Sequence, residues 1–150
     1  MHDIGKLLLL QKHTDTYEKL CKRAIADGLG SVEGELLEYP FDHTHVGHLI
    51  AERWNFSEEL TTIIRNHHQP WSELSYLSPT GLVKAANILT HALGLVQDRE
   101  SSHLRSVYEP LVDETWEHLR IPKSSQDTIA REAQRSFEEE YEIYASWGHA

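Results

Sequence analysis

The sequence predicts an all-α protein that folds as one domain over residues 1–150. Apolar residues recur at intervals of three and four in most segments, which is the spacing of one helix face. Short Ser, Pro and Gly clusters separate these segments and suit helix ends. No run of alternating apolar and polar residues, the pattern of a half-buried strand, competes with them. At 150 residues the chain has the length of a single domain with its own core.

Two helices are expected at the start of the chain. The first is Leu-rich and runs from Met1 to about Lys12. The second runs from about Asp15 to Ala26 and ends at Asp27-Gly28, because glycine commonly follows the last turn of a helix. Residues Ser31 to Glu38 can form a short third helix that ends before Pro40.

The middle of the chain predicts three more helices. One runs from Asp42 to Trp54. The next begins after Ser57, which can cap a helix that starts with two glutamates, and another begins at Ser78-Pro79 because proline suits the first helical turn. The residues expected on the inward faces are His43, Val46, Gly47, Ile50 and Trp54, then Leu60, Ile63, Ile64 and His67, and finally Leu82, Ala86, Leu89 and Leu93.

The last third of the chain predicts two helices after a polar stretch from Gln97 to Ser102. One lies around Pro110 to Leu119, and a long closing helix runs from about Ser124 to Trp147. Phe137, Tyr141 and Tyr144 form an aromatic line along one side of the closing helix, and we expect this line to pack in the core. The acidic run Glu138 to Glu140 is expected to be a solvated face.

Composition limits the classes of partner. The chain has 14 Lys and Arg against 24 Asp and Glu, a formal charge of −10, which disfavours binding to phosphate backbones and anionic lipid. The single cysteine, Cys21, excludes an internal disulfide and suits a reduced compartment. The apolar run Leu7 to Leu10 is too short to span a membrane. We therefore expect a cytoplasmic protein with no nucleic-acid or membrane partner.

Eleven histidines are unusually many for this length. His2 and Asp3 are adjacent on the first expected helix, and Lys6 lies one turn after His2. Helical neighbours are about 100° apart around the axis, so both His2 and Asp3 can reach a metal beside that helix. Imidazole with carboxylate suits zinc, iron, manganese or nickel rather than calcium. Lys6 could bind a phosphate oxygen beside such a site.

Three further histidines are expected to point inward. His43 and His67 lie on inward faces, and His68 stands one turn after Ile64. A buried imidazole needs a hydrogen bond or a metal, and for a single histidine a hydrogen-bonded core residue is the commoner outcome. Together with the opening His-Asp pair, these residues are expected to gather at one site. Six of the other histidines are expected to be solvated or at helix ends: His45, His48, His91, His103, His118 and His149.

Four strings of the sequence resemble those of a known family. They are HDIGKLLL, DHTHVGHLIAERWNFSEEL, IIRNHHQP and GLVKAANILTHALGL. Together they resemble HDOD domains and, more distantly, HD-GYP proteins and other HD-superfamily phosphohydrolases, from His2 to about Leu95. The resemblance implies an HD-superfamily-like bundle of about six to eight helices. It also implies that the N-terminal helices of a full HDOD domain are lacking, so that residues 1–150 could be the C-terminal part of a longer domain.

The resemblance also implies the roles of particular residues. The HD pair falls on His2 and Asp3, and the phosphate-contacting lysine falls on Lys6. A divalent transition metal, iron, manganese, zinc or nickel, is the implied cofactor, although the family pattern leaves open whether it is bound. Its implied ligands are His2, Asp3, His43, His67 and His68.

Three departures from the catalytic pattern bear on function. Asn87 stands where the pattern has an aspartate, and an amide is a poorer ligand for a transition metal than a carboxylate. No GYP motif follows HHQP, and the histidine that precedes the HD pair in catalytic relatives has no counterpart in these 150 residues. The expected function is thus a non-catalytic HDOD-type module that transmits signals through contacts with signalling proteins.

Two alternatives and one further expectation stay open. The chain could be a metal-dependent phosphohydrolase acting on a nucleotide or cyclic dinucleotide, with Lys6 and Asp3 as catalytic residues. The histidine cluster could also hold only water. We further expect a homodimer, because the apolar run Leu7 to Leu10 would otherwise face solvent.

Overall fold

The computed structural model describes residues 1–95 and 102–147, with side-chain surroundings for 1–95 and 105–141. All regular structure in these residues is helical, which confirms the all-α prediction. Short 3₁₀ turns lie at Trp71–Glu73 and Glu109–Leu111. The α-helices are α1 (Ile4–Lys12), α2 (Thr14–Ala26), α3 (Ser31–Glu38), α4 (His43–Arg53), α5 (Glu58–Asn66), α6 (Pro79–Ala92), α7 (Ser102–Tyr108), α8 (Val112–His118) and α9 (Lys123–Trp147).

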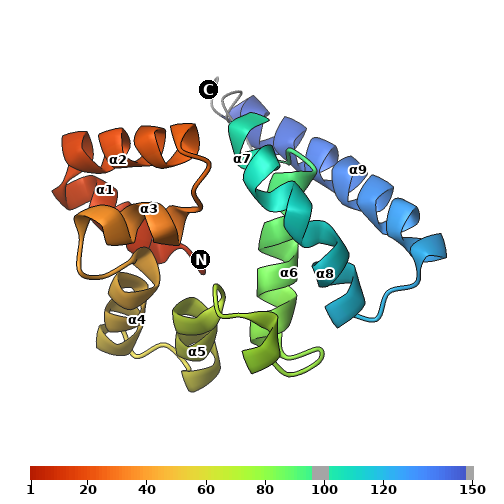
Figure 1. Cartoon of the computed structure of the whole chain (residues 1–150), viewed down its shortest axis with the longest axis horizontal. Coiled ribbons are helices and arrows are strands. Elements are labelled where there is room, and N and C mark those ends of the chain that lie inside the picture. The colour runs from red at the N-terminus through yellow and green to blue at the C-terminus, as the bar shows by residue number, and fades with distance from the viewer. Residues whose placement is uncertain (96–101, 148–150) are drawn as a thin grey trace.

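The helices form two groups joined by α4 and α5. Figure 1 shows α1, α2 and α3 on one side, α6, α7, α8 and α9 on the other, and α4 and α5 between them below. Helix α4 packs against both α1 and α5, while α5 packs against α6. Along the described residues, no helix is both long enough and apolar enough to cross a membrane.

Side-chain caps fix where three of the helices begin. Asp42 accepts hydrogen bonds from the backbone N–H groups of Thr44 and His45, at 2.8 and 3.1 Å. Ser57 caps α5 and Ser78 caps α6 in the same way. Such caps satisfy N–H groups that have no partner within the helix. The cap at Asp42 makes His43 the first residue of α4.

The largest apolar cluster lies around α6. It contains Trp71, Ala85, Ile88, Ala92, Tyr108 and Leu119. Its members come from α6, α7 and the segments that flank α6 and α8, so it forms the core of the second group of helices.

Two glycines bring α1 and α4 unusually close. A Cβ atom on Gly5 would overlap with the carbonyl oxygen of His43 and lie 2.8 Å from the nitrogen of Gly47. A Cβ atom on Gly47 would lie 2.7 Å from Cγ2 of Ile64, on α5. Both distances are shorter than real carbon contacts, so these positions need glycine. This close approach sets Asp3, just before α1, beside the start of α4.

Several predicted inward faces are wrong in part. Trp54 is 60% exposed, Leu60 41% and Leu82 46%. Ala86 is also exposed, and α6 instead buries a neighbouring stripe that includes Ala85, Ile88 and Ala92. On a helix with many apolar residues, the three- and four-residue spacing fits either of two adjacent faces as the buried one. Packing against α5, α7 and α8 selects the one with small side chains.

The C-terminal third differs most from prediction. Helix α7 was not predicted, and the polar stretch Gln97–Ser102 lies, apart from Ser102 itself, outside the described residues. The predicted core packing of the aromatic line on α9 is wrong for Tyr141, which is 45% exposed. Phe137 is partly buried and stacks on Tyr141. The side chain of Tyr144 lies outside the described set. The run Glu138–Glu140 is exposed, as predicted.

Replacing Gly5 with alanine tests the close approach of α1 and α4. Gly5→Ala should lower the free energy of unfolding by about 3 kcal/mol, because the added methyl group forces the two backbones apart and outweighs the gain in helix propensity. Urea unfolding followed by circular dichroism measures this loss. The exposed residue Gln11, on the same helix, provides the control, and Gln11→Ala should change stability by less than about 0.5 kcal/mol. Equal stability of the two variants would contradict the packing.

Candidate metal centre

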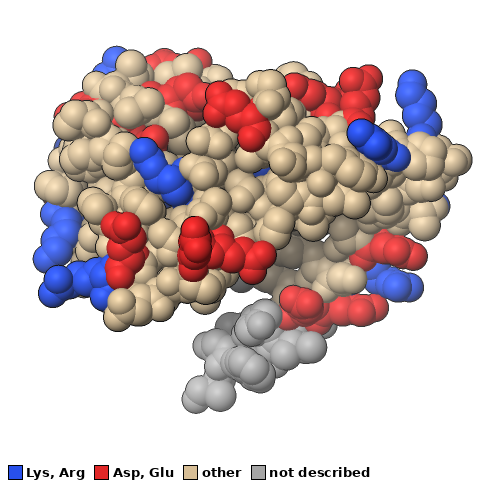
Figure 2. Space-filling view, turned by 90° about the horizontal axis from the view of Figure 1, so that it is seen from below, with Lys and Arg blue, Asp and Glu red and all other residues tan. Residues whose placement is uncertain are grey.

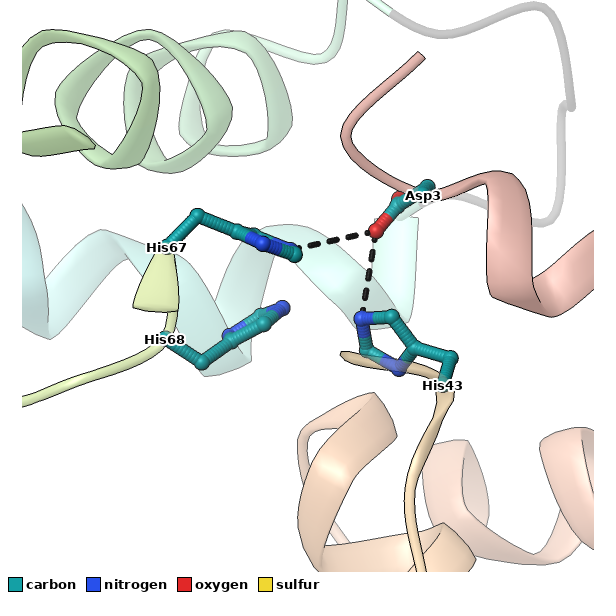
Figure 3. A group of neighbouring side chains, drawn as sticks. All are labelled: Asp3, His43, His67 and His68. Carbon is teal, nitrogen blue, oxygen red and sulfur yellow. Dashed lines mark ion pairs between the residues drawn. The ribbon is translucent and has the colours of Figure 1, made fainter. Parts of the chain in front are cut away.

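Four of the residues singled out in the sequence meet at one point. Asp3 precedes α1, His43 begins α4, and His67 and His68 follow α5. One ligand atom from each lies within 4.8 Å of the others. Figure 3 shows the carboxylate of Asp3 between the rings of His43 and His67, with the ring of His68 facing the same space. The gathering of these four side chains, which we call the Asp–His cluster, agrees with the expectation from helical spacing.

The atoms that face one another in the cluster are buried and unpaired. Asp3 Oδ1 lies 3.2 Å from His43 Nε2 and 3.3 Å from His67 Nε2. None of these three atoms makes a hydrogen bond, and His68 Nε2 makes none either. His43 is 0% exposed and His67 is 1% exposed. Buried polar atoms normally have partners, so several unpaired atoms at one point are a donor set that a cation could satisfy.

Hydrogen bonds on the far side of two rings fix which nitrogen faces Asp3. His67 Nδ1 lies 3.0 Å from the carbonyl oxygen of Ile64, which can only accept, so Nδ1 carries the proton. His43 Nδ1 likewise donates to Glu35 Oε2 at 2.7 Å. In its neutral form, each ring then directs the lone pair of Nε2 toward the carboxylate of Asp3. Lone pairs that face an anion repel it unless a proton or a metal ion lies between them. The donor set therefore fits a transition metal.

Glu35 supports the cluster and was missed in the sequence. It is 0% exposed. Its Oε1 accepts from the Tyr17 hydroxyl at 2.6 Å, and its Oε2 accepts from both the backbone N–H and Nδ1 of His43. A carboxylate behind a histidine is the usual second layer of a metal site, because it fixes the ring and raises its basicity. Helix α3 carries three glutamates, and nothing in their spacing alone marks this one as buried.

Lys6 is part of the same network, but its charge is already paired. Its Nζ lies 2.8 Å from Asp3 Oδ2. This contact holds one carboxylate oxygen of Asp3 and leaves Oδ1 to the imidazoles. Lys6 therefore orients Asp3.

His2 stands beside the Asp–His cluster and is not one of its four members. Its ring packs edge-on against His67 with centroids 4.8 Å apart, and its Nε2 lies 3.6 Å from Asp3 Oδ2. Burial lowers the pKa of His2, an effect that the negative charge of Asp3 only partly offsets. The structure thus brings together four of the five predicted ligands.

The protonation of the cluster follows from burial and its carboxylates. Burial opposes ionisation of Asp3, but His43, His67 and Lys6 outweigh it and hold the pKa of this carboxyl far below its usual range. Burial also opposes protonation of His43, yet the carboxylates of Asp3 and Glu35 raise its pKa. His68 has no such support, and burial together with the two nearby imidazoles lowers its pKa to about 2.

Four further described histidines also lie outside the cluster. His45 contacts Arg65 at 2.9 Å, and His48 lies 3.6 Å from Glu52. His91 and His118 lie in the last turns of α6 and α8, as expected for helix-end residues, but both are partly buried. His91 stacks on Tyr108 and His118 on Trp71. The side chains of His103 and His149 lie outside the described residues.

The position at which the resemblance implied an aspartate is also buried. Asn87 lies in α6 at 9% exposure and interacts with the hydroxyl of Tyr108, whose pKa burial raises to about 12. Asn87 is therefore engaged with α7, the helix that carries Tyr108.

The comparison with known families bears on the same part of the chain. Residues 1–70 match the family model of the HDOD domain, which supports the resemblance seen in the sequence. The matched span runs from α1 through α5 and includes all four residues of the Asp–His cluster. No curated protein and no solved structure matched the chain.

The lowered pKa of His68 predicts how the stability of the metal-free protein varies with pH. Below its ordinary value of 6.5, His68 is protonated in the unfolded chain but stays neutral in the folded protein down to about 2. Acid therefore favours unfolding, and this residue should cost up to about 2 kcal/mol between pH 6.5 and about pH 5.

Chemical denaturation of wild type and His68→Gln in a chelator, at both pH values, isolates the effect. The wild type should lose more stability than the variant as the pH falls. His43, whose raised pKa acts in the opposite direction, is present in both proteins and largely cancels. Parallel stability curves would show that His68 is not buried in the neutral form.

Proposed function

We propose that this chain is an HDOD-type signal-transduction module in which a divalent transition metal organises a surface for protein contacts without catalysing a reaction. The observation that carries this proposal is the convergence of unpaired atoms from Asp3, His43, His67 and His68 at one buried point. Three imidazoles with one carboxylate suit zinc, iron, manganese or nickel. When bound, such a metal supplies a fixed positive charge at the place where the lone pairs meet.

The four residues link three separate parts of the fold. Asp3 lies just before α1, His43 is the first residue of α4, and the two histidines follow the end of α5. Holding all four residues at one centre restrains these helices relative to one another. Gain or loss of the ion would therefore change the relative positions of α1 and α4. A partner protein that contacts the outer faces of both helices would then bind the two states differently.

Two features of the chain argue against hydrolysis as its main role. Asn87 replaces the carboxylate of the catalytic pattern with a neutral amide, and it is engaged with Tyr108. Lys6, the residue that would steady a phosphate in the phosphohydrolase alternative, has its charge paired with Asp3. Both features weaken the site for a phosphorylated substrate. Phosphohydrolase activity on a nucleotide or cyclic dinucleotide is the alternative to be tested.

The partner that we propose for α1 is a second copy of this chain. Leu7 is 68% exposed and Leu10 is 39% exposed, and the two residues lie one turn apart on the same helix. Exposed apolar residues that cluster in this way favour a symmetric contact. Signalling proteins would then bind the dimer.

Charge supports a cytoplasmic protein partner over nucleic acid or membrane. Lys and Arg on the face seen in Figure 2 are interspersed with Asp and Glu and form no broad basic patch. The net charge of −10 acts in the same direction, because it repels polyanions.

Metal content of protein purified without chelator tests the proposed centre. The wild type should carry near-stoichiometric transition metal by elemental analysis, and His67→Ala should carry little. Glu35→Gln should bind the same metal roughly 10- to 100-fold more weakly in a chelator competition, because the ring of His43 loses its carboxylate support. Glu33→Gln, at an exposed position of the same helix, is the matched control and should bind like wild type.

Activity measurements on the metal-loaded protein separate signalling from hydrolysis. We expect no turnover of bis(p-nitrophenyl) phosphate or of cyclic dinucleotides. Turnover that depends on the metal and disappears in His67→Ala would favour the phosphohydrolase. Wild-type protein with no transition metal, even after reconstitution, would refute the metal centre.

Sedimentation velocity at micromolar concentration tests the dimer. The wild type should sediment as a dimer, and Leu7→Glu combined with Leu10→Glu should sediment as a monomer, because two carboxylates cannot be buried in an apolar contact. Leu82→Glu, at an exposed leucine of α6, should leave the dimer intact. A wild-type monomer at this concentration would rule out the proposed contact.

A further inference from the structure

A second site lies behind the Asp–His cluster. A partly open cavity of about 190 Å³ is lined by side chains from α1, α2, α3, α6 and α7. Leu20, Ile25 and Leu29 supply part of its apolar wall, while Lys6, Glu35 and His91 are among its polar lining residues. It thus reaches from the HDOD part of the chain to the second group of helices shown in Figure 1.

The charged groups that line the cavity are already engaged by other partners. Lys6 is paired with Asp3 at 2.8 Å. Glu35 accepts hydrogen bonds from Tyr17 and His43 at 2.6 and 2.7 Å. A charged ligand would therefore enter a largely apolar space without a free counter-charge, which is costly. The cavity favours a neutral occupant.

His91 lines this cavity, and one of its ring nitrogens is unpaired. Its ring stacks on Tyr108 with centroids 4.5 Å apart and an interplanar angle of 16°, which fixes its orientation. Its Nδ1 is shielded from solvent and has no hydrogen-bond partner. Burial lowers the pKa of His91, so the ring is neutral and offers one donor and one acceptor. An unpaired buried group of this kind is destabilising until a partner arrives.

The volume sets the size of that partner. An apolar cavity of about 150 Å³ holds a benzene molecule, so this cavity suits a single ring or a short alkyl chain with one further group. A nucleotide is too large. Water alone would leave the apolar wall of Leu20, Ile25 and Leu29 poorly contacted.

We propose that this cavity binds a neutral, mainly apolar small molecule of about the size of one aromatic ring, with a single hydrogen-bonding group directed at His91. The binding itself does not require a metal. An effect of this binding on signalling rests on the proposed function. Lys6 and Glu35 line the cavity, and they also contact Asp3 and His43, respectively. A molecule lodged there would thus bias the cluster and the packing of α2 and α3 against α6 and α7.

Phenol and toluene are a suitable pair of probes, because they have nearly the same size and differ by a hydroxyl in place of a methyl group. Titration of the isotope-labelled full chain, followed by amide resonances, measures both affinities. Both probes should shift resonances of α2 and α3. In His91→Phe, which keeps an aromatic ring against Tyr108, the ratio of phenol to toluene affinity should fall roughly fivefold, the value of about one hydrogen bond.

A matched control comes from the second histidine that stacks on an aromatic ring. His118 packs on Trp71, also has an unpaired ring nitrogen, and does not line this cavity. His118→Phe should leave the phenol to toluene ratio unchanged. Leu29→Phe, which fills part of the cavity, should weaken both probes. Cys21 also lines the cavity, so phenol should slow its alkylation by iodoacetamide in the wild type.

Three outcomes would overturn the proposal: no resonance shift at the cavity with either probe, an unchanged affinity ratio in His91→Phe, or tighter binding of benzoate than of phenol. Each titration is carried out on metal-free and on metal-loaded protein. Probe binding without metal binding would refute only the metal centre. Metal binding without probe binding would refute only the cavity site.

Discussion

The burial of one carboxylate among imidazoles is the constraint on which the rest of this structure depends. Asp3 Oδ1 faces Nε2 of both His43 and His67 within 3.3 Å, in a place that solvent does not reach. Such an arrangement needs a proton or a metal ion between the groups. It also needs α1 and α4 to approach as closely as Gly5 and Gly47 permit. Helix packing and site chemistry are therefore two aspects of the same contact.

The supporting groups extend this constraint into the body of the domain. Lys6 holds one oxygen of Asp3, and Glu35 holds the ring of His43 while it accepts from Tyr17 on α2. The network ties α1, α2, α3 and α4 together through polar contacts. Three residues of this network, Lys6, Tyr17 and Glu35, also line the cavity that His91 lines. A short chain of hydrogen bonds therefore connects the Asp–His cluster with this cavity.

Agreement between sequence and structure is best where local patterns act alone. The helix starts predicted at Asp42, Ser57 and Ser78-Pro79 agree with α4, α5 and α6 to within one residue, because a helix start depends on residues within one turn. The burial of His43 and His67 also follows from helical phase. The exposure of Leu82 does not, because an apolar helix has more than one possible inward stripe and only its neighbours select between them.

The sequence by itself determined the helical class, the HDOD character of residues 1–70 and the histidines that turn inward, since each depends on spacing along one helix or on a local string. Only the tertiary structure decided that Glu35 is buried behind His43, that His2 stands aside from the cluster, and that His91 lines a cavity with Lys6. These facts depend on which faces of distant helices meet. Side-chain packing between elements far apart in the chain fixes them, and no periodicity within a single helix contains that information.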